Sequence, residues 1–174
     1  KLNLLFVGRF VNNKGINILL KAARELNAEG YADKISYILA GAGPLYKLYT
    51  TNFKYKNVTY LGNVLGEQLL DLYKSADLFV LPTIFEGMPL VVLEAMSYAL
   101  PVIVSDTGAT SELVDGSNGY LIKRKDAAAL KNAIIDFCGL NQEQKNHLAR
   151  NSYNKAKNYF SWGRVSAQYI ELFL

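Results

Sequence analysis

The chain has 174 residues, of which 51% are hydrophobic and 20% charged. This composition is typical of a globular domain and excludes a disordered chain, and the length suits one domain with a hydrophobic core. The sequence has no run of eighteen apolar residues, so it predicts no membrane-spanning helix. A single cysteine excludes an internal disulfide and points to a reducing compartment. The net charge of +4 suits anionic ligands or an anionic membrane surface, whereas no aromatic–basic motif indicates nucleic acid.

Apolar runs of strand length alternate with helical stretches along the chain. We expect strands at 2–8, 34–41, 57–62, 77–82, 101–106 and 119–123. We expect helices at 16–30, from about 44, and at 66–76, 88–99, 126–138, 141–158 and about 161–173. This alternation predicts an α/β fold, a doubly wound Rossmann-like parallel sheet of about six strands with helices on both faces. Such sheets bind ligands at the carboxyl ends of their strands.

The loop after the first strand carries two cations. Gly8 ends the strand, Arg9 and Lys14 follow it, and Gly15 opens the next helix. Cations beside a helix N-terminus favour a phosphate or diphosphate, although both side chains could also be ordinary solvated loop cations. The loop lacks the G-x-G-x-x-G pattern of dinucleotide-binding dehydrogenases. The G-A-G-P at 41–44 is compatible with a close ligand or with a tight turn.

The segment between the fourth strand and its helix favours a ligand site as well. Gly87 permits an unusual backbone conformation, and Pro89 fits the first position of the helix. The N–H groups around Leu90 and Val91 would then face a phosphate. Glu86 can accept hydrogen bonds from sugar hydroxyls, although a carboxylate near a helix N-terminus also has a purely electrostatic explanation.

Glu94 is the one group charged at neutral pH between Met88 and Ser105. We expect a carboxylate in so apolar a helix to be buried or half-buried, which costs several kcal/mol unless it is paired. A pair of vicinal hydroxyls, such as those of a ribose, is one partner. A buried ion pair with Arg9 or a lysine is the alternative.

These motifs resemble a known family. G-R-x4-K-G, G-x-G-P, E-G-M-P-L-x3-E-A-M-x3-L-P-V-I-V-S and G-x3-E-L-V-x-G-x-N-G are similar to the C-terminal domain of retaining GT-B glycosyltransferases of family 4, also called group 1. The resemblance covers nearly the whole chain, and the E-x7-E spacing from Glu86 to Glu94 is its most specific element. Met88 replaces the Phe of the common E-G-F-P form, and Leu100 stands where a Gly often precedes the Pro.

The resemblance implies that residues 1–174 are the donor-binding half of a two-domain enzyme that transfers a sugar from a nucleotide-diphosphate donor with retention. Glu86 would contact the transferred sugar, while Arg9 and Lys14 would hold the diphosphate; these three form the expected catalytic group. Glu94 would bind the ribose. The expected donor-binding residues are Gly8, Gly62, Val64, Gly87, Met88, Pro89, Leu90, Val91 and Glu94.

The resemblance also implies partners and a setting. No metal is expected, because the family is usually metal-independent and the sequence has no D-x-D triplet. No other cofactor is expected either, since the nucleotide sugar is a substrate. A saccharide or lipid-linked acceptor would be held by an N-terminal domain that this chain lacks, so the chain alone is expected to be inactive. Polysaccharide synthesis in the cytoplasm, at the inner face of the membrane, is the expected setting, which allows for peripheral membrane association of the full-length enzyme.

Two alternatives remain open on the sequence alone: a nucleotide-sugar epimerase with the same two-domain plan, and a non-catalytic nucleotide-binding module. Four other residues receive structural interpretations. Cys138 is expected to pack on an apolar helix face and His147 to be solvated. Trp162 is expected to anchor the last helix by packing, and Glu112 to have a structural role.

Overall fold

Six parallel strands form one sheet in the order β3–β2–β1–β4–β5–β6 in the computed structural model, which describes residues 1–171. The prediction of a doubly wound parallel sheet of about six strands is confirmed. The chain reverses its direction of progress between β1 and β4, so the switch point lies at the centre of the sheet. The strands are β1 Leu2–Val7, β2 Ile35–Ala40, β3 Val58–Gly62, β4 Leu78–Leu81, β5 Val102–Ser105 and β6 Gly119–Ile122.

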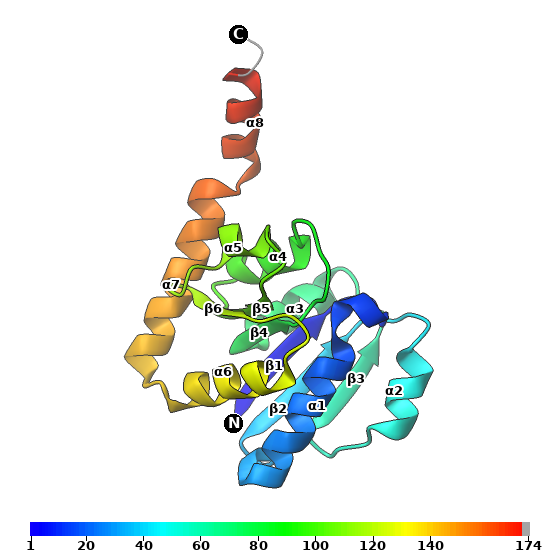
Figure 1. The fold of residues 1–174 in the computed structure, drawn as a ribbon. Helices are drawn as coiled ribbons and strands as arrows, with labels where there is room; N and C mark the ends of the chain where they lie inside the picture. Colours follow the sequence, from blue (N-terminus) through cyan, green and yellow to red (C-terminus); the bar gives the residue numbers. More distant parts are fainter. Residues whose placement is uncertain (172–174) are drawn as a thin grey trace.

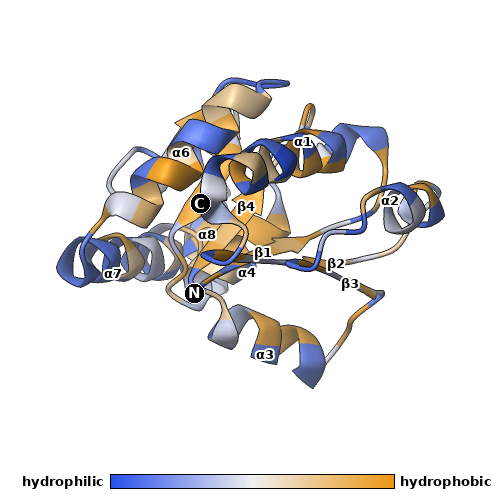
Figure 2. Ribbon diagram, turned by 90° about the horizontal axis from the view of Figure 1, so that it is seen from below, coloured by the Kyte–Doolittle hydropathy of each residue, from blue (hydrophilic) through white to orange (hydrophobic). Residues whose placement is uncertain are grey.

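Helices connect the strands and cover both faces of the sheet. Figure 2 shows α1 and α6 on one face and α3 on the other, and α7 packs along α4. The helices are α1 Ile16–Leu26, α2 Tyr46–Asn52, α3 Glu67–Ser75, α4 Leu90–Ser97, α5 Thr110–Leu113, α6 Ala127–Gly139, α7 Gln142–Tyr159 and α8 Trp162–Glu171. Because both faces are covered, β4 is a continuous apolar run, and every residue of β4 and of its neighbour β5 is buried.

Several helix ends differ from the predictions by one or two residues; α4, for example, was predicted at 88–99 and spans Leu90–Ser97. The helix predicted for 16–30 ends at Leu26 and continues as a π turn, Asn27–Tyr31, in which Gly30 takes a left-handed conformation with φ 86°. The four-residue α5 was not predicted, since one helical turn is too short to show a hydrophobic period. The predicted last helix is observed up to Glu171, and its remaining predicted residues lie outside the described part.

The prediction that Trp162 anchors the last helix is wrong. Its side chain is 88% exposed. Figure 1 shows α8 projecting beyond the sheet and its helices as a continuation of α7, so this part of the molecule offers Trp162 no pocket to fill. The interpretations of Cys138 and His147 are confirmed: Cys138 is half-buried against the core, and His147 is exposed. None of the helices within residues 1–171 combines the length and the apolar character that crossing a membrane requires.

Candidate functional site

The loops after β1 and β4 are joined at the carboxyl end of the sheet. Thr83 donates its hydroxyl to the carbonyl of Asn13 over 2.7 Å, and the N–H of Ile84 donates to the same carbonyl over 2.7 Å. Gly15, with φ 70°, approaches Pro82 so closely that a Cβ there would lie 1.8 Å from the Pro82 carbonyl oxygen. Only glycine fits this contact, and it holds the two predicted ligand loops against each other.

The loop after β2 is joined to its neighbours in the same way. The N–H of Gly41 donates to the carbonyl of Gly62 over 2.6 Å, and a Cβ on Gly41 would lie 1.9 Å from the carbonyl oxygen of Gly8. The glycines at 41–43 therefore serve close backbone packing between loops. The loops that follow β1, β2, β3 and β4 thus form one connected rim, which contains most of the residues predicted to bind a donor.

Lys14 and Glu86 meet on this rim although they are far apart in the sequence. The Lys14 ammonium forms an ion pair and hydrogen bond with Glu86 Oε2, and both side chains are about one-fifth exposed. Lys14 is therefore not an ordinary solvated loop cation. Arg9 is exposed, and its side chain makes no ion pair or hydrogen bond with the residues that the structure describes. The rim thus carries one paired and one unpaired cation.

The N-terminus of α4 opens beside this pair. Pro89 has an extended backbone (φ −76°, ψ 103°) and caps the helix, so the prediction that it is the first helical residue is off by one position. Val92 donates its N–H to the Pro89 carbonyl over 3.0 Å, whereas the N–H groups of Leu90 and Val91 have no acceptor inside the helix. Gly87, Met88 and Leu90 are exposed. This end of α4 is open to a ligand.

Glu94 is exposed, so the prediction of a buried or half-buried carboxylate is wrong. Val92, Ala95 and Met96 form the buried face of α4, and Glu94 lies outside that face. The alternative of a buried ion pair is wrong too. Instead, the Glu94 carboxylate accepts a 2.8 Å hydrogen bond from the hydroxyl of Tyr73 on α3.

Tyr73 was not identified from the sequence. Its side chain is only 1% exposed and stacks on Tyr98, with ring centroids 5.6 Å apart and planes 10° apart. Burial, followed by the hydrogen bond to Glu94, raises the pKa of Tyr73 well above its ordinary value, so the hydroxyl keeps its proton and donates it. Tyr73 fixes one oxygen of an exposed carboxylate and leaves the other free for a ligand.

The remaining predicted positions lie at the ends of β3 and β5. Gly62 takes a left-handed conformation with φ 69° at the end of β3, and Val64 is half-buried against the core. Glu112 is exposed on α5 and makes no side-chain hydrogen bond or ion pair among residues 1–171. Within that same range, no three His, Cys, Asp or Glu side chains gather as a metal site would require. The expectation that the chemistry uses no metal stays a prediction.

Comparisons with known proteins give a consistent assignment. Residues 1–139 match the family model described as glycosyl transferases group 1. TuaC of Bacillus subtilis, a glycosyltransferase named for teichuronic acid biosynthesis, is 38% identical over 133 residues, which cover 76% of this chain and 32% of TuaC. A UDP-Gal:α-D-GlcNAc-diphosphoundecaprenol α-1,3-galactosyltransferase of Escherichia coli is 30% identical over 161 residues, 89% of this chain and 41% of the enzyme.

Comparison of the fold with solved structures points in the same direction. The crystal structure of Anabaena HepE in complex with UDP-glucose superposes with a TM-score of 0.81 at 24% identity, and the match covers 99% of this chain and 48% of HepE. Sucrose-phosphate synthase of Thermosynechococcus elongatus superposes with a TM-score of 0.82 at 26% identity, over 99% of this chain and 45% of that enzyme. The sheet order and its helices are those of the Rossmann-like half of GT-B glycosyltransferases. The chain spans about a third to less than half of the length of the curated relatives described above.

Proposed function

The chain belongs to the family of group 1 glycosyl transferases, and from this we propose that it is the donor-binding, C-terminal half of a nucleotide-sugar-dependent glycosyltransferase that retains the anomeric configuration. The observation that carries the proposal is the rim at the carboxyl ends of β1–β4. There, the Lys14–Glu86 pair lies beside the open N-terminus of α4. Glu94, about one turn into α4, presents an exposed carboxylate that a hydrogen bond from Tyr73 orders.

In this proposal each group has a distinct task. Arg9, Lys14 and the free N–H groups of Leu90 and Val91 bind the donor diphosphate and stabilise the charge that develops on it as the sugar–phosphate bond breaks. Arg9 contributes a planar fork of donors, whereas Lys14 acts as a movable point charge. When Lys14 turns to the diphosphate it loosens its ion pair with Glu86, and the Glu86 carboxylate becomes free to accept hydrogen bonds from the transferred sugar.

The nucleoside is held at the other side of the rim. Glu94 accepts hydrogen bonds from the two ribose hydroxyls through the oxygen that Tyr73 leaves free. Gly62 and Val64 lie beside the base, while Gly8, Gly87, Met88 and Pro89 shape the backbone around the diphosphate and sugar. The donor is proposed by analogy with HepE, whose crystal structure holds UDP-glucose. The chemistry is proposed to need no metal.

The acceptor is proposed to be a saccharide or a lipid-linked saccharide that a separate N-terminal domain holds against this rim. Two relatives support a role in polysaccharide assembly: TuaC is named for teichuronic acid biosynthesis, and the Escherichia coli enzyme is named for a diphosphoundecaprenol-linked acceptor. The setting proposed for the full-length enzyme is the cytoplasmic face of a membrane, to which it would bind peripherally.

A thermal-shift screen of this chain against UDP, GDP and ADP and their sugar conjugates tests the donor proposal. A ligand at ten times its Kd adds about 1.4 kcal/mol of stability, which raises Tm by about 3–6 °C in a domain of this size. We expect one nucleotide family to give such a shift in the wild-type chain and in Glu143→Gln, an exposed control on α7, and a smaller shift in Glu94→Gln. No shift with any nucleotide diphosphate would contradict the proposal.

Activity separates transferase from epimerase in the full-length enzyme. A transferase consumes the nucleotide sugar only when an acceptor is present, whereas an epimerase of the same plan changes the sugar without one. Loss of transfer in Glu86→Ala is expected, while full activity of that variant would contradict the role assigned to Glu86. Nucleotide binding with neither activity would favour the non-catalytic module.

A further inference from the structure

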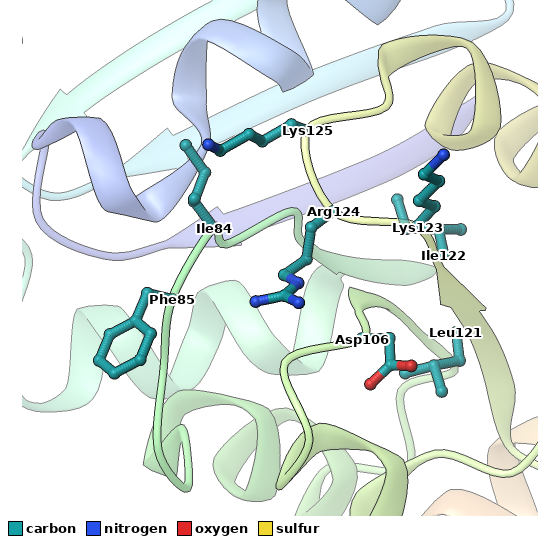
Figure 3. Close-up of a pocket in the computed structure, with 8 residues that line it drawn as sticks. All are labelled: Ile84, Phe85, Asp106, Leu121, Ile122, Lys123, Arg124 and Lys125. Atoms are coloured by element: carbon teal, nitrogen blue, oxygen red, sulfur yellow. The ribbon is translucent and has the colours of Figure 1, made fainter.

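A second concavity opens next to the rim, at the carboxyl ends of β4, β5 and β6. It has a volume of about 790 Å³ and is lined by Ile84, Phe85, Asp106 and the run from Leu121 to Lys125. Figure 3 shows the Arg124 guanidinium reaching into the space between Phe85 and Asp106, while the Lys125 side chain extends toward Ile84. Lys123 points away from this space and lies at its edge.

The three cations of this pocket are the densest basic run in the chain. None of the three side chains forms an ion pair or a hydrogen bond within residues 1–171. With Asp106 as the one acidic residue, the formal charge of the lining is +2, from three positive groups and one negative group. Unpaired cations in a pocket whose lining has a net positive charge favour an anionic ligand.

The backbone holds these cations in place. The run occupies the short turn between β6 and α6, and Asp126 caps α6 by accepting a 2.9 Å hydrogen bond from the N–H of Ala129. Lys125 has φ 60°, a left-handed conformation that is unfavourable for a residue with a side chain. Such strained conformations persist where the surrounding structure enforces them, and they cluster at functional sites. The turn places Arg124 between the end of β6 and the capped start of α6.

The pocket and the rim share one loop. Glu86 pairs with Lys14 on the rim, and its neighbour Phe85, which is 73% exposed, lines the pocket. A molecule in the pocket therefore lies directly beside the position proposed for the transferred sugar. The donor diphosphate is already accounted for by Arg9, Lys14 and α4. These groups leave the pocket available to a different molecule, and its position suits the acceptor.

We propose that this pocket binds a phosphate or diphosphate group of the acceptor, with Arg124 as its bidentate ligand and Lys125 as a second cation. Arg–phosphate pairs are planar and bidentate, which fixes orientation as well as charge. Phe85, Ile84 and Leu121 offer an apolar wall to the part of the acceptor next to the phosphate. This inference rests on the proposed glycosyl transfer for its choice of occupant, and it places an acceptor contact on this half of the enzyme.

The binding test uses the 174-residue chain saturated with UDP, so that the rim is occupied. Inorganic diphosphate is titrated while the backbone N–H signals are followed by two-dimensional NMR. We expect saturable shifts at Asp106 and at Leu121–Lys125. We expect Arg124→Gln to weaken this binding about tenfold, and we expect no change in Arg24→Gln, an exposed arginine on α1 that serves as the matched control.

Further arms identify the source of the phosphate. A sugar 1-phosphate should bind and the same sugar without phosphate should not; geranyl diphosphate binding more tightly than inorganic diphosphate would identify a lipid-linked acceptor. Three results would overturn the inference: shifts confined to the rim, equal affinity in Arg124→Gln and wild type, or binding to phosphatidylglycerol vesicles without binding to any soluble phosphate. Failure of UDP to bind counts against the donor proposal alone, since the diphosphate titration follows the N–H signals of Leu121–Lys125 independently of UDP binding.

Discussion

The close contact between Gly15 and Pro82 predicts that a Cβ atom at position 15 lowers the stability of the folded chain. In Gly15→Ala, the new Cβ would lie 1.8 Å from a backbone oxygen, whereas real Cβ atoms stay beyond 3.0 Å of such atoms. The two loops must therefore separate by more than an ångström. The left-handed backbone of Gly15, φ 70°, adds a conformational cost of about 1–2 kcal/mol for alanine.

Gly30 provides the control that isolates the contact. It is also left-handed, with φ 86°, but a Cβ there would meet nothing within 4 Å. We therefore expect Gly30→Ala to lower the free energy of unfolding by about 1–2 kcal/mol. We expect Gly15→Ala to lower it by about 1–3 kcal/mol more, the usual range for overpacking. Asparagine tolerates the left-handed region, so Gly30→Asn should be close to neutral while Gly15→Asn stays destabilising.

Urea unfolding followed by circular dichroism measures these differences. Trp162 is a poor fluorescence probe for this purpose, since it is exposed in the folded chain. The contact between the loops would be refuted as a constraint if Gly15→Ala and Gly30→Ala differed by less than about 0.5 kcal/mol, the usual scatter of surface substitutions.

Two further predictions concern single side chains. Tyr73→Phe removes the hydroxyl that orders Glu94 and should weaken UDP binding about 2- to 10-fold, the range for one net hydrogen bond; equal effects of Tyr73→Phe and of Tyr98→Phe, its stacking partner, would contradict this. The Lys155 ammonium, and then the Ser117 hydroxyl, lower the pKa of Asp115 to about 2, so its stabilising effect is present above about pH 4 and is lost as the pH falls through about 2. The Asp115 side chain is 51% exposed, so this effect stays below about 1 kcal/mol. NMR titration of the Asp115 carboxyl in Lys155→Gln should give a midpoint above about 2 but below the ordinary value of about 3.9, because both hydrogen bonds from Ser117 remain. An unchanged midpoint would show that Lys155 does not lower this pKa.

Much of the fold was predictable because buried parallel strands are continuous apolar runs with short connections. The six strands and their parallel arrangement follow from that pattern, whereas their order in the sheet comes from the structure. The cluster of loops that forms the rim was predictable for the same reason. The partnership of Lys14 with Glu86, 72 residues apart, was not, since the sequence contains no signal for which of several loop cations meets which carboxylate.

The environment of Glu94 could not be predicted from helix composition. An apolar sequence around a carboxylate suggests burial, but α4 buries only the face formed by Val92, Ala95 and Met96. Whether the remaining face is covered depends on how neighbouring helices pack. Tyr73 gave no signal either, because a tyrosine at a buried helix position usually serves packing alone. Trp162 shows the opposite error, since a large apolar side chain remains exposed when no element lies over it.

The calorimetric titration of UDP and UDP-glucose into the chain and its two carboxylate variants tests the central claim most directly. Glu94→Gln should weaken both ligands by the same factor, because the ribose is common to them. Glu86→Gln should weaken the binding of UDP-glucose only. The Glu86→Gln chain should bind UDP at least as tightly as the wild type does, since Lys14 is then released from its ion pair. Equal weakening of UDP and UDP-glucose by Glu86→Gln, or no effect of Glu94→Gln on either ligand, would contradict this division of roles.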